Sequence, residues 1–380
     1  MKENVRHIIL ILFMVCSLAP DIISYNGNSL KLMYIVFGIL LFIVIMGRKV
    51  VLPPKKLMFF FFIMILISLI ASIKWGVDRL FFNYCFGFVI ICIILSIAKD
   101  RNEILDEKIF RTVWIILVGL VVINDIKQGS KFIEYVAFHL EHPYIDTVVT
   151  GGVNLEATWI GILAISFFNS KKRWWPFVIS CCISLIYASR VGIIANVIAC
   201  FIFIFGKKDM DSKRKILNRR VILTIFMSVI LVFFLKKGFQ QSLLILIRFK
   251  EIGFDNGSVG RLSMWKFVIP TLMEYPFGVG LGNSIKSIET ISHLKYMEDN
   301  IHNLYMQMFV ELGVIGGGMY LWLWGNYLKK EIKNILTSPI VSMLFIYFIL
   351  AFLQFTGGET IFFCILGVYL TKNKKELTSK

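Results

Sequence analysis

The chain has 380 residues, of which 57% are hydrophobic and only 17% charged, with a mean hydropathy of +0.76 and a formal net charge of +17. A soluble globular domain is nearer half apolar and a quarter charged, so this composition indicates a polytopic membrane protein. Most of the 41 Lys and Arg residues lie between apolar segments, where they act as topology signals, so the charge does not predict a nucleic-acid partner. The seven cysteines all lie inside apolar segments, which predicts neither a disulfide framework nor a zinc site.

A membrane-spanning helix needs about 20 mainly apolar residues. Apolar runs of roughly this length predict an all-α protein with about twelve transmembrane helices and one long outer loop. Residues 1–20 resemble a signal peptide, but more membrane segments follow, so we interpret them as part of an uncleaved first span. The predicted spans are 7–24, 30–47, 57–73, 80–98, 112–126, 153–170, 174–189, 191–206, 220–235, 303–327, 337–355 and 359–371.

The positive-inside rule orients these spans. With the N-terminus inside, the cytoplasmic segments hold most of the basic residues, so both termini are predicted to be cytoplasmic. The chain then divides into nine N-terminal helices (1–235), a long extracytoplasmic loop (236–302), and three C-terminal helices with a cytoplasmic tail (303–380).

Two outer segments, 127–152 and 236–302, are longer than ordinary connections. The second is predicted to contain short amphipathic helices around 238–252 and 262–274. A loop above about 15 residues is usually either functional or disordered. Because this one carries aromatic residues and a glycine cluster rather than low-complexity sequence, a functional loop is favoured.

Three arginines on the predicted outer side are candidate site residues. Arg190 is the only break between two apolar runs, whereas Arg248 and Arg261 lie in the long loop. A guanidinium group is a permanently charged fork that suits phosphate oxygens. The alternatives are an interfacial arginine that extends to lipid headgroups for Arg190, and solvated surface charge for the other two. The functional interpretation of Arg261 is favoured by Trp265, which follows one helical turn later.

The stretch Pro276-Phe-Gly-Val-Gly-Leu-Gly-Asn283 places a glycine at every second position. No preceding strand or following Lys-Ser/Thr supports a phosphate-binding loop. We instead interpret it as a turn that lets the backbone pass close to another segment.

His302 and Asn303 lie where the long loop re-enters the membrane. A histidine there could act as a general base, and Asn303 could contact substrate or simply cap the helix that follows. Glu311 lies about 13 Å deeper along that helix and points away from His302, so it is predicted either to serve function or to pair with a buried arginine. Glu156 opens another span from the outer face, where it could neutralise an arginine or contact a sugar.

Together these residues resemble the O-antigen polymerase and ligase superfamily of bacterial envelope glycosyltransferases. The resemblance rests on Arg261-x-x-x-Trp265, on the glycine turn, and on His302-Asn303 followed by nine residues and Gly313-x-x-Gly316. Ser189-Arg190 is similar to the outer-face arginine of that family. Motif density is high only over 261–316.

The resemblance implies a GT-C-like membrane fold with its site at the outer face of the bacterial cytoplasmic membrane. It also implies transfer of a glycan from an undecaprenyl-diphosphate carrier, without a nucleotide sugar, a cofactor or a metal ion. His302, Arg261 and Arg190 are then the predicted catalytic residues, and the predicted substrate-binding residues are Arg248, Trp265, Asn303, Glu311 and Glu156.

The leading hypothesis is a polymerase of O-antigen or capsule repeat units, with a ligase that shares the donor as the nearest alternative. A flippase or transporter of lipid-linked oligosaccharide is a different class, and it predicts polar residues near mid-membrane on several helices. The expected partners are the lipid-linked glycan, the bilayer, and a chain-length regulator and flippase of the same pathway.

Overall fold

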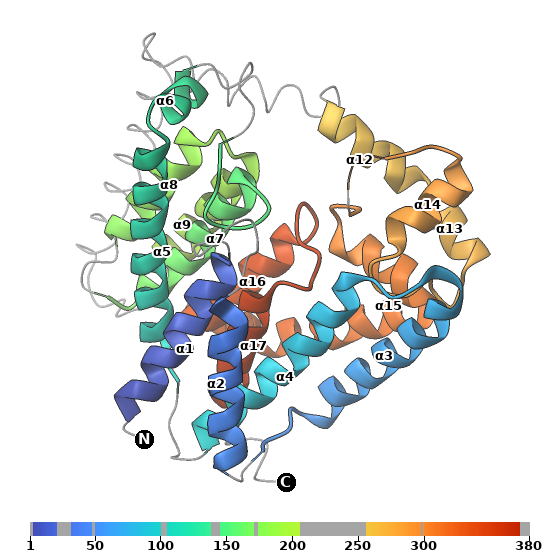
Figure 1. Cartoon of the computed structure of the whole chain (residues 1–380), viewed down its shortest axis with the longest axis horizontal. Coiled ribbons are helices and arrows are strands. Elements are labelled where there is room, and N and C mark those ends of the chain that lie inside the picture. Colours follow the sequence, from blue (N-terminus) through green and yellow to red (C-terminus); the bar gives the residue numbers. More distant parts are fainter. Residues whose placement is uncertain are drawn as a thin grey trace. The chain divides into compact units, whose positions relative to one another are not determined.

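In the computed structural model (Figure 1), the residues described are 3–20, 32–47, 50–99, 105–137, 145–170, 174–205, 256–296, 298 and 300–372. Every regular element in these ranges is a helix, which confirms the all-α class for this part of the chain. Four helices are long and apolar enough to cross a membrane, and seven shorter apolar helices accompany them. This supports a membrane protein, whereas twelve spans, their orientation and a GT-C-like fold stay predictions. The four long helices are α3 (Lys55–Trp75), α4 (Arg79–Lys99), α5 (Glu107–Gln128) and α15 (Leu304–Glu331).

The chain forms two compact units, each built from three separate stretches of sequence. Unit 1 comprises Met1–Val36, Glu107–Glu251 and Lys333–Ile346. Unit 2 comprises Phe37–Asp106, Ile252–Ile332 and Tyr347–Lys380. Two helices, α2 (Leu32–Met46) and α16 (Pro339–Leu350), run across a division between the units.

Unit 1 centres on α7 (Val153–Ala164), which packs against α5, α8 (Trp174–Ile186) and α9 (Arg190–Phe205). Close approach of α7 and α9 depends on Gly192, since a Cβ atom there would lie 2.7 Å from the Cβ of Ala157. Three further elements belong to this unit. The helix α1 (Glu3–Leu18) packs against α5. The others are the short helix α6 (Ser130–Ala137) and the 3-10 turn η1 (Ile165–Phe167), which continues α7.

Unit 2 holds two helix pairs, in which α3 packs against α15 and α4 packs against α17 (Thr360–Lys372). In the first pair, Phe60 lies beside Tyr320 and Ile67 beside Gly316, so the two helices run antiparallel. In the second, Gly87 leaves room for the ring of Phe363. Unit 2 also contains three short helices, α12 (Asn256–Lys266), α13 (Val268–Glu274) and α14 (Ser284–Ser292). The turn η2 (Ile332–Asn334) follows α15 and contains a boundary between the units.

Eleven of the twelve predicted spans overlap described helices, although only four of these helices are long enough to span a membrane, and the twelfth predicted span, 220–235, lies outside the described residues. The segment expected to be helical around 262–274 instead forms two helices, α12 and α13, which meet at Phe267. Pro270 explains the break, because it has no N–H to donate and its ring would clash with the carbonyl of Lys266 in a continuous helix. The helix α14 was not predicted, and the one expected around 238–252 lies outside the described residues.

Candidate active site

The His302-Asn303 segment begins α15, and Asn303 is its N-cap. The Asn303 side chain accepts a hydrogen bond from the amide of Met306 at 3.1 Å, and the side chain is only 5% exposed. This contact satisfies one of the amide groups that a helix leaves unpaired at its start. Of the two roles considered for Asn303, the structure shows the capping role.

Nine residues separate Asn303 from Gly313, which breaks α15. Its φ of 68° and ψ of −172° lie in a region that only glycine adopts without strain. Three residues further on, Gly316 lets the helix approach α3, since a Cβ atom there would lie 3.2 Å from Ile67. A Cβ atom added at Gly318 would have no neighbour within 4 Å, so not every glycine of the run 316–318 is needed for helix packing.

The glycine turn of 276–282 lies against that break. The amide of Val279 donates to the carbonyl of Val310 at 3.2 Å, and the amide of Gly280 to that of Glu311 at 2.8 Å. In return, Val314 donates to the carbonyl of Pro276 at 2.9 Å. The turn therefore satisfies backbone groups that the break removes from the helix. This confirms the interpretation of the glycine repeat as a close backbone approach.

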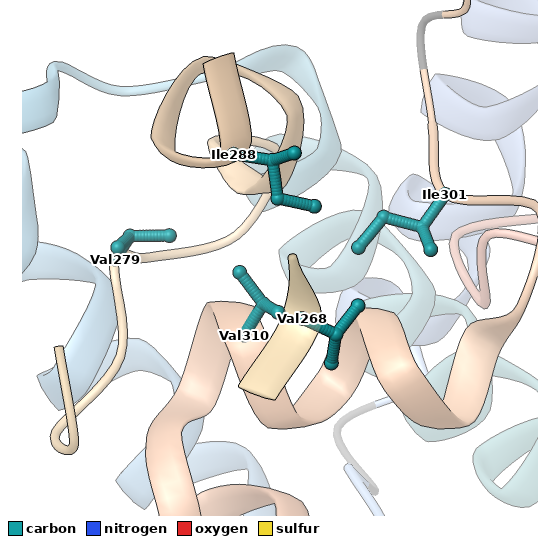
Figure 2. Close-up of a cluster of buried hydrophobic side chains, with 5 residues drawn as sticks. All are labelled: Val268, Val279, Ile288, Ile301 and Val310. Carbon is teal, nitrogen blue, oxygen red and sulfur yellow. The ribbon is translucent and has the colours of Figure 1, made fainter. Parts of the chain in front are cut away.

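A small apolar core holds these segments together. Figure 2 shows its five buried side chains pointing toward a common centre. They come from α13, the glycine turn, α14, the residue before His302 and the residue before Glu311. Burial of each such side chain stabilises the packing by about 1.5–3 kcal/mol, so the core positions both the glycine turn and the start of α15. The five are Val268, Val279, Ile288, Ile301 and Val310.

His302 is hydrogen-bonded to Glu298, a residue that was not predicted. The distance from His302 Nε2 to Glu298 Oε2 is 2.8 Å, and the two side chains are 15% and 32% exposed. The His302 backbone has a φ of 55°, and its amide donates to Asn300 Oδ1 at 2.8 Å. A carboxylate that is hydrogen-bonded to one ring nitrogen of a histidine fixes the orientation of the ring. The spacing Glu-x-x-x-His was the only available signal for this pair.

Arg261 and Trp265 lie one turn apart on α12, and both are partly buried. The indole Nε1–H of Trp265 donates to the carbonyl of Ile301 at 2.9 Å. This bond ties α12 to the residue that precedes His302. Trp265 was predicted to bind substrate, and the structure gives its N–H a partner within the protein.

Glu311 is fully buried beside the helix break. Its Oε1 accepts a hydrogen bond from Nε2 of Gln307 at 3.0 Å. Ser284 and Gly282 lie near the carboxylate, but its second oxygen, Oε2, is buried without a hydrogen-bond partner among the described residues. A buried carboxylate is costly unless hydrogen-bond donors satisfy it, and the donor seen here, Gln307, lies one turn earlier on α15 itself. No arginine is among these contacts, and substrate contact by Glu311 stays a prediction.

Arg190 lies in unit 1, as the first residue of α9. Ser189 caps this helix, since its Oγ accepts from the amide of Gly192 at 3.1 Å. The preceding turn has Ala188 at a φ of 47°. Because Arg261 and His302 belong to unit 2, the structure brings those two residues into one unit and leaves Arg190 in the other.

Glu156 belongs to a buried hydrogen-bond cluster in unit 1. The hydroxyl of Tyr187 lies 2.7 Å from Glu156 Oε1 and 2.9 Å from Asp125 Oδ2, and the amide of Val149 donates to Glu156 Oε2 at 2.8 Å. Tyr187 in turn accepts from the Tyr135 hydroxyl through its carbonyl at 3.1 Å. Tyr187 stands three residues before Arg190, so the cluster anchors the turn that positions this arginine. Neither Tyr187 nor Asp125 was predicted.

Arg248 lies outside the described residues. Within the described ranges, no group of three or more His, Cys, Asp or Glu side chains could hold a metal ion.

The comparison with protein families supplies the remaining evidence. Residues 175–321 match the model of the O-antigen ligase family. The match confirms the resemblance to the O-antigen polymerase and ligase superfamily, over less than half of the chain. It includes Arg190, the glycine turn, His302 and the break at Gly313, whereas Glu156 precedes it. A search of curated proteins finds no match.

Proposed function

We propose that this protein is a polysaccharide polymerase of the bacterial cytoplasmic membrane. It transfers a growing glycan from an undecaprenyl-diphosphate carrier to a lipid-linked repeat unit of O-antigen or capsule, at the outer membrane face. The observation that carries the proposal is the Glu298–His302 pair at the start of a membrane-spanning helix, inside the segment that matches O-antigen ligases.

The pair supplies acid–base chemistry for the acceptor. The acceptor hydroxyl attacks the anomeric carbon of the donor sugar, and its proton passes to the Glu298–His302 pair. As the new glycosidic bond forms, the bond between the anomeric carbon and the diphosphate oxygen breaks, and the electron pair leaves with the diphosphate. Glu298 is the more exposed member of the pair, at 32% against 15%, so its carboxylate is the more accessible to an acceptor.

The lipid diphosphate leaving group requires positive charge near the membrane surface. Arg261 supplies it from the same unit as His302, and Arg190 and Arg248 remain further candidates. Trp265 holds α12 against the residue that precedes His302, and thereby sets the position of Arg261, one turn away, relative to the pair.

An O-antigen ligase is the second candidate function, because the matched family carries that description. It uses the same donor and the same chemistry, and differs only in its acceptor. A flippase or transporter is the remaining alternative, and it would not depend on the acid–base pair.

Surface-glycan profiling of a deletion strain tests the proposal. The strain is complemented with wild type, His302→Asn or His293→Asn. Both histidines have a φ of 55°, which asparagine tolerates, so the second variant is a matched control for the loss of a loop histidine. We expect single repeat units, or no capsule, with His302→Asn at normal protein levels, and long chains with His293→Asn.

The alternatives give different glycans. Long chains that stay on the lipid carrier would identify a ligase and overturn the polymerase. Single lipid-linked units that accumulate on the inner leaflet would identify a flippase. Long surface chains with His302→Asn would remove the catalytic role of the pair.

A further inference from the structure

A cavity of about 440 Å³ opens between α3 and α15. It lies at the amino end of α3, beyond the contact between Phe60 and Tyr320, and therefore toward the opposite end of this helix pair from the break at Gly313. Its walls are almost entirely apolar, and two lysines stand at one end. The lining residues are Lys55, Lys56, Phe59, Phe60, Met319, Trp322 and Leu323.

The lining combines a buried floor with an exposed rim. Phe60 and Leu323 are 3% and 2% exposed, whereas Phe59 and Trp322 are 57% and 53% exposed. Both helices are long and apolar enough to span a membrane, so this rim faces hydrocarbon in the membrane-embedded protein. An apolar groove on such a surface fits an acyl chain.

The two lysines give the groove a charged end. Lys56 Nζ lies 5.1 Å from the centroid of the Trp322 ring, an arrangement that suits the boundary between hydrocarbon and headgroups. The first turn of α3 has no acidic residue and no side-chain cap, so no carboxylate of that turn offsets the lysines. An ammonium pair at the headgroup level selects a phosphate with a net negative charge over a zwitterionic headgroup.

We propose that this groove binds an anionic phospholipid, with one acyl chain between Phe59 and Trp322 and its phosphate at Lys55 and Lys56. The last turn of α15 places Lys329 and Lys330 near the same end of the helix pair. By the positive-inside rule this basic end faces the cytoplasm, so the lipid comes from the inner leaflet. The site is separate from the candidate active site and does not depend on the proposed glycan transfer.

Native mass spectrometry of the full-length protein in a neutral detergent tests the site. Phosphatidylglycerol and phosphatidylcholine with identical acyl chains are the probes, and glycerol phosphate is the competitor. The double variant Lys55→Gln/Lys56→Gln removes the charge at the groove. Lys329→Gln/Lys330→Gln is the matched control, because it removes two lysines near the same end that do not line the groove. Met319→Trp fills the cavity and leaves the lysines in place.

We expect wild type to bind phosphatidylglycerol about tenfold more tightly than phosphatidylcholine. Lys55→Gln/Lys56→Gln abolishes this preference, Lys329→Gln/Lys330→Gln keeps it, and Met319→Trp weakens both lipids. Equal weakening by both lysine pairs would show diffuse attraction to a basic surface and overturn the proposal. Competition by glycerol phosphate as strong as by the lipid, or unchanged binding to Met319→Trp, would refute the acyl-chain part.

Discussion

The break in α15 makes Gly313→Ala the sharpest test of how the motif region is built. The φ and ψ angles of Gly313 are accessible only to glycine, so alanine there costs about 1–3 kcal/mol in backbone strain. An added Cβ atom would also collide with backbone atoms of the glycine turn, since the Pro276 carbonyl oxygen and the Phe277 carbonyl carbon lie within 2.5 Å of its position. Backbone atoms cannot rotate away as a side chain can.

Relieving the collision must displace the turn and the three hydrogen bonds that join it to α15. Each such bond contributes about 0.5–1.5 kcal/mol. With the strain included, we expect Gly313→Ala to lower the free energy of unfolding by about 3 kcal/mol or more. Gly318→Ala is the matched control, because it lies on the same helix with no neighbour within 4 Å of the added Cβ. Alanine there stabilises a helix by about 0.5–1 kcal/mol.

The assay is reversible unfolding of the two variants and wild type in detergent, followed by tryptophan fluorescence. The two substitutions add the same methyl group to the same helix, so the difference between them isolates the break. If the free energies of unfolding of Gly313→Ala and Gly318→Ala differ by less than about 0.5 kcal/mol, the turn does not pack against the break as described.

Three further substitutions address the site and its supports. Glu298→Gln should reduce glycan polymerisation as much as His302→Asn, and the double variant should be no worse, because the two residues act as one unit; additive losses of in vitro chain-extension rate would contradict this. Asn303→Ala should lower the free energy of unfolding by about 1 kcal/mol, because alanine cannot cap the helix. Asn303→Ser should lower it much less, because serine also caps helices, and an equal loss in both variants would rule out the capping role. Tyr187→Phe should cost about 1–3 kcal/mol in the same detergent assay, since it removes the hydroxyl that lies beside the buried Glu156 carboxylate, and an unchanged stability would contradict a stabilising role for this hydroxyl.

The apolar helices were predictable because hydrocarbon imposes a length and a composition on any segment that crosses it. For that reason α3, α4, α5 and α15 all lie where apolar runs of the sequence place them. The helix cap was also available from the sequence, since asparagine before an apolar run is a local signal. Pro270 is a local signal of the same kind, and it marks the division between α12 and α13 that the apolar pattern alone does not predict.

The contacts that build the site were not predictable in the same way. The glycine turn and the break at Gly313 are about 35 residues apart, and the sequence indicates only that each needs close approach, not that each is the other's partner. Tyr187 and Asp125 meet across 62 residues. Glu298 is only four residues from His302 in the sequence, but the segment between them is irregular, so the spacing does not predict that the two side chains meet.

The structure gives the residues of the His-Asn-x9-Gly-x-x-Gly motif different structural roles. Asn303 starts the helix, Gly313 ends its first nine-residue segment, and Gly316 seats the continuation against Ile67 of α3. A spacing of nine residues is then the length of helix, about 13 Å, between the loop that carries His302 and the turn that lies against the break. In the structure, the motif therefore consists of a helix start, a helix break and a packing contact that follow His302, the proposed catalytic residue. Under the proposed function, we therefore expect the choice of acceptor, and with it the choice between polymerase and ligase, to depend on residues around the Glu298–His302 pair that the motif does not contain.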